Sequence, residues 1–585
     1  MNYNELRALL FRRLSIPKEE HLKKVLRSFS IAERFTLYAF IGIFILSSLF
    51  LILNVSNTFL KEVPTRGGTL VEGIIGNPRF INPVLALSEA DRSLTALVYS
   101  GLLHIGEDGV PREELASQLE IGTDGLTYTL TIDEDAYFHD GEKVEAEDVL
   151  FTVTKILDPL IKSPRRGDWD GVTVEEIDRN TVVFHLKKPY APFIENLTVG
   201  ILPKHIWQNV SNEEFVFSQW NTLPIGSGPY RVESVERNSG GIPDYYKLVP
   251  FENLSRNGAY IDSLVFRFFP NEDALLSAYK NNEIESFGGI NLEKIESIKS
   301  NSSEVISAPL PRVFAVFFNQ NQAKIFSHKE IRKALELASP KQTIVDKILR
   351  GHGTVIDSPI PAGIFDWNDE SMDRRGELER LQEAEKLLEK NGWKKNENGI
   401  LEKKIGKDIM TLSFSISTGD APELKMVAEE LLKTWGAIGA DVRIITHETG
   451  ELNQSVIRPR QFDALLFGEV VGRDADVYPF WHSSQRTDPG LNIALYANSR
   501  VDKLIGDARA TSDRGEVENL YKAFVKEIRE DVPAVFLYTP SFLYVVPNKV
   551  KSLNVGAIST PQDRFLNAED WYIDTDKVWN IFTNN

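Results

Sequence analysis

Apolar and polar positions divide the chain into one long apolar segment and a longer region with the periods of a globular protein. Phe35 to Leu60 contains no charged residue, and its first nineteen positions are almost wholly apolar. A helix rises about 1.5 Å per residue and a bilayer core is about 30 Å thick, so roughly 20 such residues suffice to cross it. The segment predicts a transmembrane helix over residues 35–55, because a buried core helix normally keeps a polar stripe.

After a short linker at residues 56–66, apolar positions alternate between the strand period and the helix period. Strands are predicted at Thr69–Ile75, Leu126–Ile132, Thr181–Leu186, Thr411–Ser417 and Asp441–Ile445. Helices are predicted at Ser88–Leu103, Ala146–Leu157, Leu378–Lys390 and Pro422–Ile438. The order of strand, helix and strand after residue 411 is typical of a helix-covered sheet, so we expect an α/β fold.

The charge is divided unevenly on the two sides of the apolar segment. Residues 1–34 carry eight Lys and Arg against four Glu, a net of +4, so the whole-chain charge of −18 leaves −22 after the segment. Basic tails stay in the cytoplasm, which places the long acidic part on the extracytoplasmic face of the cell membrane. The basic region is too long for a signal peptide, and the chain has no cysteine to carry a lipid, so we expect an uncleaved single-pass anchor.

Composition and motifs exclude several classes of function. The negative charge argues against a nucleic-acid partner, because phosphate binding requires a basic surface. The sequence contains no P-loop, GxGxxG, HExxH or GxSxG pattern, and its nine histidines do not fall in metal-ligand spacing. We therefore expect no enzymatic activity, no cofactor and no bound metal.

A series of short motifs occurs in one order along the chain. They are GGTL from Gly67, FINP from Phe80, LVYSGLL from Leu97, FHDGEKVEAEDV from Phe138, PIGSGPY from Pro224, AVFFNQN from Ala315, LNIALYANSRVDKLI from Leu491 and DVPAVFLY from Asp531. In this order the motifs resemble the family 5 extracellular solute-binding proteins, the peptide- and nickel-binding components of ABC importers. Each motif alone is weak, but the shared order makes coincidence improbable.

The resemblance implies a two-lobed periplasmic-binding-protein-like fold of the large type II form. The first lobe would comprise about 67–309 and 538–585, and the second about 311–532. Two hinge crossings are expected, near Leu310–Val313 and Pro533–Leu537, with the ligand held in the cleft between the lobes. The implied function is capture of peptides by a monomer that delivers them to permease subunits in the membrane.

The segment Phe467–Gln485 mixes small, acidic and aromatic residues without a helix or strand period, which indicates a loop. In peptide-binding relatives an aspartate of the corresponding loop accepts the α-ammonium group of the ligand, and Asp474 and Asp476 match that position best. Both could instead be turn residues. Tyr478 and Trp481 are candidates for stacking on the ligand, with ordinary packing as the stronger alternative.

Four further residues complete the candidate site, and two of them mark departures from the family. Glu469 stands where relatives often have tryptophan, which predicts a more negative pocket. The loop at Thr418 has no cation, whereas dipeptide-binding relatives use an arginine there for the ligand carboxylate. This absence favours longer or basic peptides. Asn319, in the AVFFNQN motif, and Trp367 are additional candidates for substrate contact.

Three alternatives to peptide capture stay open at this point. The ligand could be a nickel chelate or another small solute. The protein could be a sensor that signals ligand occupancy through its helix, although the short tail contains no recognisable output domain. It could also be a hydrolase, although no nucleophile and base arrangement is visible.

Overall fold

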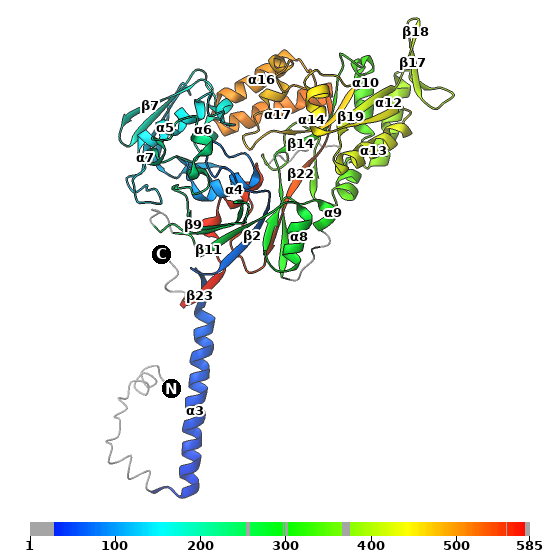
Figure 1. Cartoon of the computed structure of the whole chain (residues 1–585). Coiled ribbons are helices and arrows are strands. Elements are labelled where there is room, and N and C mark those ends of the chain that lie inside the picture. The colour runs from blue at the N-terminus through cyan, green and yellow to red at the C-terminus, as the bar shows by residue number, and fades with distance from the viewer. Residues whose placement is uncertain are drawn as a thin grey trace, which may run out of the picture. The chain divides into compact units, whose positions relative to one another are not determined.

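The computed structural model describes residues 28–252, 258–295, 298, 302–365, 375–556 and 558–579, and it divides the chain into two units. The first unit is Met1–Thr65 with Asp574–Asn585, and the second is Arg66–Ile573. In the first unit, helix α3 (Ile31–Phe59) runs directly into strand β1 (Leu60–Thr65) (Figure 1). β1 pairs antiparallel with β23 (Asp574–Trp579), so most of the expected linker is a strand.

Helix α3 is apolar around its whole circumference. Its stretch Ile31–Phe50 has a mean hydropathy of 1.4, and none of it is buried. Phe35 and Phe44 are among the exposed side chains. By length and composition this is the one helix among the described residues that could cross a membrane, which suits either a signal sequence or an anchor.

The second unit is built on a large mixed sheet with the strand order β20-β19-β21-β14-β22-β12-β2-β11-β10-β9, with β13 and β15 also paired to β22. The bounds of these strands, in the same order, are Asp441–His447, Ser413–Gly419, Ala464–Val470, Arg312–Phe318, Ala534–Pro547, Ser286–Gly288, Thr69–Ile75, Ser263–Phe269, Pro243–Pro250 and Tyr230–Arg237, then Ser303–Pro309 and Gly353–Val355. The sheet contains two parallel blocks, β20-β19-β21 and β12-β2-β11, and its other pairs along this order are antiparallel, as in an α/β fold with crossover helices.

Smaller sheets and the helices complete this unit. A four-stranded sheet has the order β5-β6-β8-β7, at Ala116–Ile121, Thr127–Ile132, Thr181–Leu186 and Val172–Asp178. β3 (Leu103–Ile105) pairs with β4 (Pro111–Glu113), and β16, β17 and β18 span Lys394–Lys395, Leu401–Ile405 and Asp408–Thr411. The helices α4 to α17 are Glu89–Val98, Ala146–Leu157, Phe193–Asn196, Lys204–Trp207, Glu272–Lys280, Leu292–Ile295, Lys329–Leu337, Lys341–Thr343, Glu377–Lys390, Pro422–Ala437, Thr449–Glu451, Tyr478–Trp481, Ser499–Ala510 and Arg514–Asp531.

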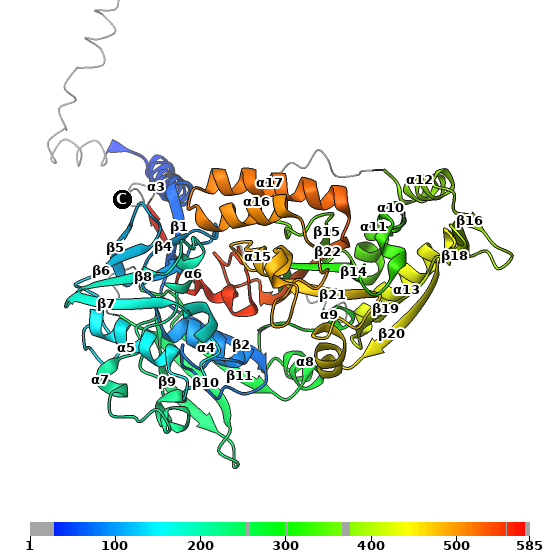
Figure 2. The same cartoon turned by 90° about the horizontal axis from the view of Figure 1, so that it is seen from above.

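The buried side chains of this unit form separate hydrophobic cores that define two lobes. We call lobe 1 the part from β2 to β13 together with the chain after Ser541, whose side chains fill two cores. We call lobe 2 the part from β14 to the first half of β22, whose sheet has one core on each face. In lobe 2, α10, α12 and α13 cover one face of the sheet, and α15, α16 and α17 cover the other (Figure 2).

Two chain crossings join the lobes, and they lie side by side. β13 passes to β14 through Leu310 and Pro311, while β22 continues without interruption from one lobe into the other. The two crossings are bonded to each other, since the Leu310 amide donates to the Pro540 carbonyl at 2.9 Å. β22 stays paired with β14 as far as Tyr538, so its crossing lies at Thr539–Ser541 and not at the expected Pro533–Leu537.

Several expected elements have the predicted bounds, but one helix is shorter. β2 coincides with the predicted strand, and α13 ends one residue before the predicted end. The helix expected over Ser88–Leu103 ends at Val98, because the PIGSGPY motif packs against its last turn. The Gly228 amide donates to the Val98 carbonyl at 2.8 Å, and a Cβ atom at Gly226 would lie only 2.0 Å from the same oxygen.

A buried ion pair attaches the C-terminal segment to lobe 1. Arg564 is 0% exposed and contacts Glu72 of β2 at 3.0 Å and Glu89 at 3.2 Å. Glu72 also accepts hydrogen bonds from Tyr544, at 2.9 Å, and from Ser286. Every charged group of this cluster therefore has a partner, as burial of charge requires.

We expect Arg564→Gln to destabilise the protein strongly, because it leaves the Glu72 carboxylate buried without a cation. The cost should be about 3 to 5 kcal/mol of unfolding free energy. Urea unfolding of the detergent-solubilised chain, followed by tryptophan fluorescence, measures it. Lys549→Gln is the control, because Lys549 pairs with Glu285 at the surface and should contribute about 0 to 1 kcal/mol. Equal losses in the two variants would contradict the assignment.

Candidate functional site

The loop that follows β21 lies at the junction of the lobes. Its first residue is tied to the hinge, since the Val471 amide donates to the Pro311 carbonyl at 2.9 Å. Gly472 has φ +86°, and Ala475 adopts φ +54°, a left-handed conformation that is uncommon for a residue with a Cβ atom. Strained backbone of this kind is often found at functional sites, where surrounding contacts hold it in place.

The carboxylate of Asp476 in this loop is paired with an arginine whose side chain contacts both lobes. It pairs with Arg509 of α16 at 2.9 Å and accepts the Tyr478 amide at 3.2 Å. The Arg509 guanidinium lies 4.7 Å from the ring centroid of Tyr190 in lobe 1 and 4.5 Å from that of Tyr478 in lobe 2. Its carbonyl also accepts the amide of Ala191, at 3.0 Å. Cation–π contacts therefore connect the lobes beside Asp476.

A second contact between the lobes comes from Arg473, which is paired with Asp563 at 2.6 Å. Both side chains are largely buried. Asp563 is fixed from the other side by the amides of Ser559 and Thr560, at 2.7 and 3.1 Å. Two of the arginines at the junction thus already have carboxylate partners.

A cavity of about 430 Å³ opens between the lobes next to these contacts. Glu195 lines it from lobe 1 and Asp474 from lobe 2, and Pro311, Ile364 and Phe365 form part of its apolar wall. Neither carboxyl group makes an ion pair with any of the described residues. Asp474 accepts only a backbone hydrogen bond, from the Asp476 amide at 3.2 Å.

Burial changes the titration of both acids. It raises the pKa of Asp474 to about 8, with further contributions from the nearby charges of Glu195 and Asp476. Burial also raises the pKa of Glu195. Asp474 therefore favours the protonated form near neutral pH while no cation is present. The arrangement is suited to accept a cationic group of a ligand, which would replace the proton.

Glu469 is buried in the protein interior and does not line the inter-lobe cavity. It is 4% exposed, faces the core beneath α16 and α17, and lines neither this cavity nor the lobe 1 cavity described below. Neither of its carboxyl oxygens has a hydrogen-bond partner among the described residues, and burial raises its pKa well above the usual range. It does not contribute a surface charge in this state.

Other predicted site residues are engaged in the fold. Thr418 is buried and donates its hydroxyl to the Leu466 carbonyl at 3.0 Å. The Asn319 side chain donates to the Arg460 carbonyl at 2.9 Å and accepts two turn amides. Trp481 is 1% exposed and packs among core aromatic residues, a placement that favours packing over ligand contact. Trp367 lies outside the described residues.

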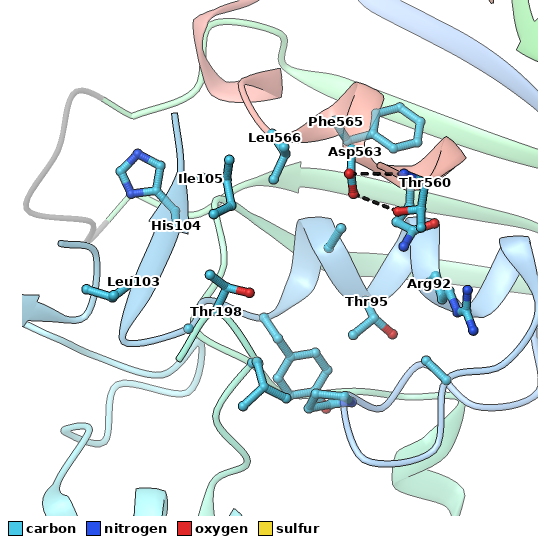
Figure 3. Close-up of a pocket in the computed structure, with 18 of the residues that line it drawn as sticks. Arg92, Thr95, Leu103, His104, Ile105, Thr198, Thr560, Asp563, Phe565 and Leu566 are labelled. Carbon is cyan, nitrogen blue, oxygen red and sulfur yellow. Dashed lines mark hydrogen bonds between the residues drawn. The ribbon is translucent and has the colours of Figure 1, made fainter. Parts of the chain in front are cut away.

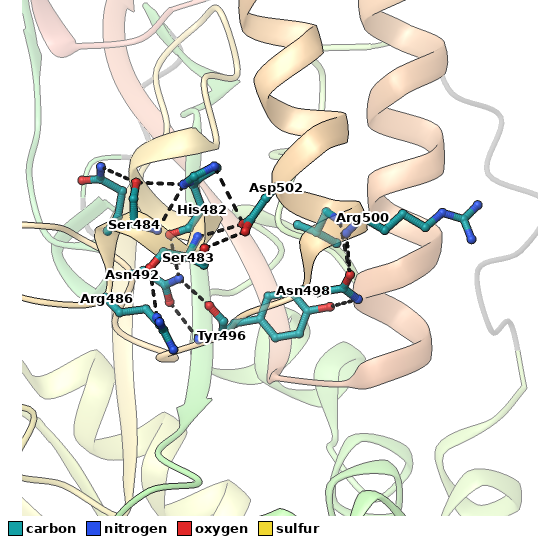
Figure 4. A network of polar contacts seen from close by, with 11 residues as sticks. His482, Ser483, Ser484, Arg486, Asn492, Tyr496, Asn498, Arg500 and Asp502 are labelled. Atoms are coloured by element: carbon teal, nitrogen blue, oxygen red, sulfur yellow. Dashed lines mark hydrogen bonds and ion pairs between the residues drawn. The ribbon is translucent and has the colours of Figure 1, made fainter.

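Tyr478 differs from these, because it stands at the junction, stacked on His482 with ring centroids 4.2 Å apart and covered by Arg509. A polar network fixes the chain after it (Figure 4). Ser483 donates its amide and hydroxyl to Asp502, at 2.8 and 2.6 Å, and Asn492 binds the His482 and Tyr496 carbonyls. The loop is thereby held at both ends.

Sequence reasoning missed Glu195, Tyr190, Arg509 and Asp563. These residues come from segments distant in the sequence and carry no local pattern, so only the packing of the lobes brings them to the loop. Arg473 is different, because it directly precedes the candidate residue Asp474 in the sequence. This position could have suggested that Arg473 pairs with an acidic residue of the site. No group of His, Cys, Asp and Glu suited to a metal ion is found in the parts of the chain that the structure describes.

The two-lobed α/β fold with a cavity between the lobes defines a periplasmic-binding-protein-like solute-binding protein. Residues 110–490 match the bacterial extracellular solute-binding proteins, family 5. The chain belongs to this family, the substrate-binding components of peptide and nickel ABC importers. The predicted fold class and family are thereby confirmed.

Known relatives match most of the chain. The oligopeptide-binding protein AppA of Bacillus subtilis is 29% identical over 518 residues, covering 87% of this chain and 92% of AppA. The structure of that protein with a nonapeptide matches with a TM-score of 0.63 and 27% identity, over 88% of this chain and 100% of that one. NikZ from Campylobacter jejuni, in complex with Ni(L-His), matches with a TM-score of 0.65 and 25% identity, over 86% and 99%.

We expect the stability of the ligand-free protein to fall as pH rises from about 6 to 8. Asp474 has a folded pKa of about 8, whereas an unfolded aspartate titrates near 3.9. Between these values the folded state binds more protons, so its unfolding free energy decreases with pH. Asp474→Asn should make the decrease shallower by on the order of 2 kcal/mol between pH 6 and 8.

Thermal unfolding at a series of pH values measures this slope. Asp507→Asn, at an exposed position on the same helix as Arg509, is the matched control and should leave the slope unchanged. A wild-type slope that Asp474→Asn does not alter would show that Asp474 is ionised in the ligand-free protein.

Proposed function

We propose that the protein captures peptides with a free N-terminus in the cleft between its lobes and delivers them to the permease subunits of an ABC importer. The observation that carries this proposal is the difference between the two aspartates of the loop. Asp476 is neutralised by Arg509, whereas Asp474 lines the inter-lobe cavity and makes no ion pair with any described residue. The likeness to oligopeptide-binding AppA supports peptide as the ligand class.

An ammonium group in this cavity would supply the missing charge. In a partly desolvated cleft, a charge-assisted hydrogen bond to a carboxylate is shorter and stronger than in water. The apolar walls exclude water from the pair, while Arg473 and Arg509 do not compete for Asp474 because each already has an acid partner. The cavity can thus accept one more positively charged group, which would pair with Asp474.

The proposed location is the extracytoplasmic face of the cell membrane, with α3 as an uncleaved single-pass anchor and the basic tail in the cytoplasm. The charge difference between the tail and the remainder supports this orientation. The unit Arg66–Ile573 would act as a monomeric binding protein, without a catalytic role. A nickel chelate is the second candidate ligand, because the similar protein NikZ binds Ni(L-His).

We expect Asp474→Asn to abolish the preference for a free N-terminus, while Asp476→Asn should keep it. The probe is the peptide selected by native mass spectrometry from mixed-sequence tri- to pentapeptides with free termini, compared with its N-acetyl form. Loss of the buried pair should weaken binding of the free form by on the order of 2 to 5 kcal/mol. A solvated carboxylate would contribute about 0 to 1 kcal/mol.

Isothermal titration calorimetry on the full-length protein in detergent gives these affinities. If Asp474→Asn binds the free peptide as tightly as the wild type, the ammonium site lies elsewhere. If no peptide is retained but a nickel–histidine chelate is, the second candidate ligand replaces peptide.

We expect the full-length chain to stay with the membrane fraction after extraction with alkaline carbonate, because its apolar helix alone is long enough to span the bilayer. N-terminal sequencing should find residues that precede Phe35. Soluble protein, or a mature N-terminus after Leu53, would identify the helix as a cleaved signal sequence. A variant with the helix deleted is the control for complete extraction.

A further inference from the structure

A second cavity, of about 370 Å³, is lined mainly by residues of lobe 1 (Figure 3). Arg473 lines both cavities. Glu195 lines the inter-lobe cavity and Thr198 lines the lobe 1 cavity, and the two residues are joined within one turn by a 3.2 Å hydrogen bond from the Thr198 amide to the Glu195 carbonyl. A ligand of peptide length could therefore contact both.

Two arginines of the lobe 1 cavity have no bonded partner. Arg92 projects from α4 on the same side as Thr95, one turn before it (Figure 3), and Arg165 comes from the loop before residues 166–169. Neither guanidinium makes a hydrogen bond or an ion pair with any described residue. Burial lowers the pKa of Arg165, and the like charge of Arg92 lowers it further, while the charges of Asp168 and Asp563 act in the opposite direction. The two cations therefore repel each other in a partly desolvated wall.

The acids of the same cavity are mostly engaged. Asp563 is paired with Arg473 and with two backbone amides, and Glu114 accepts the Ser100 hydroxyl at 2.7 Å. Glu569 also has partners in the fold. Asp168 is exposed and interacts with Arg165 only through their charges, without a bonded contact. Among the described side chains that line this cavity, the groups without a hydrogen-bond partner are therefore mainly donors.

Tyr99 adds a third donor. It is 5% exposed, lines this cavity, and its buried hydroxyl has no hydrogen-bond partner among the described residues. A buried hydroxyl is normally hydrogen-bonded, so an orphan one beside a cavity indicates a group that the ligand supplies. Two guanidinium groups and one hydroxyl together match the acceptor pattern of a carboxylate.

We propose that this cavity binds the C-terminal carboxylate of the peptide, with Arg92 and Arg165 as its charge partners and Tyr99 as a hydrogen-bond donor. This inference rests on the proposed peptide-binding function and adds a direction to it. The ammonium group lies at Asp474 between the lobes, and the chain runs past Arg473 to its carboxylate in lobe 1. Arg92 and Arg165 of lobe 1 would thus supply the positive charge that the Thr418 loop of lobe 2 lacks.

The test uses the peptide selected above in two forms, with a free C-terminus and as the C-terminal amide, on the full-length protein in detergent. Amidation should weaken binding to the wild type on the order of tenfold to a hundredfold, as expected for hydrogen bonds to a charged group. In the Arg92→Gln, Arg165→Gln double variant, the free form should bind as weakly as the amide does. The amide itself should bind both proteins alike, which also shows that the variant is folded.

Arg166→Gln is the matched control, because Arg166 is adjacent in sequence but exposed and outside the cavity lining. It should keep the full effect of amidation. If amidation changes wild-type affinity by less than about twofold, the carboxylate assignment is wrong while peptide capture stands. If no peptide binds in any form, both the proposed function and this inference are overturned.

Discussion

The continuity of β22 is the constraint on which the rest of the second unit depends. Its first half pairs with β14 in lobe 2, and its second half pairs with β12 and β13 in lobe 1. A strand satisfies its backbone groups only through its neighbours, so each lobe needs its own half of β22 to complete its sheet. The lobes are therefore joined through one continuous strand, and their two crossings are bonded to each other where the Leu310 amide meets the Pro540 carbonyl.

The pairing of charges at that junction explains which groups remain for a ligand. Arg473 and Arg509 reach toward the opposite lobe and are each bound to an aspartate. Among the described residues, Asp474 and Glu195 of one cavity and Arg92 and Arg165 of the other make no ion pair. Unpaired groups of opposite sign at two adjacent cavities fit a zwitterion better than a ligand of single charge. A peptide with free termini is such a ligand.

Much of the fold could be read from short-range patterns. The strand Thr69–Ile75 and the helix from Pro422 follow from local periodicity and capping, which act within a few residues. The end of α4 at Val98 could not be read in this way, because apolar spacing continues to Leu102 and the turn at Gly226 is what ends the helix. The crossing of β22 was misplaced for a similar reason, since its pairing with β14 extends to Tyr538.

The sequence by itself determined the apolar helix, the α/β class, the order of family motifs and the loop that carries Asp474. These properties depend on residue type and on spacing along the chain. Only the tertiary structure decided which acid of the loop is free, because the choice depends on Arg509 and on Glu195, which come from distant segments and different lobes. Likewise, Glu469 is buried because its place in β21 sets the face on which its side chain lies, and Trp481 is buried because α15 packs against the core of lobe 2. Long-range packing determines how buried each side chain is and which charges are paired. These two properties distinguish residues that can contact a ligand from residues that only support the fold.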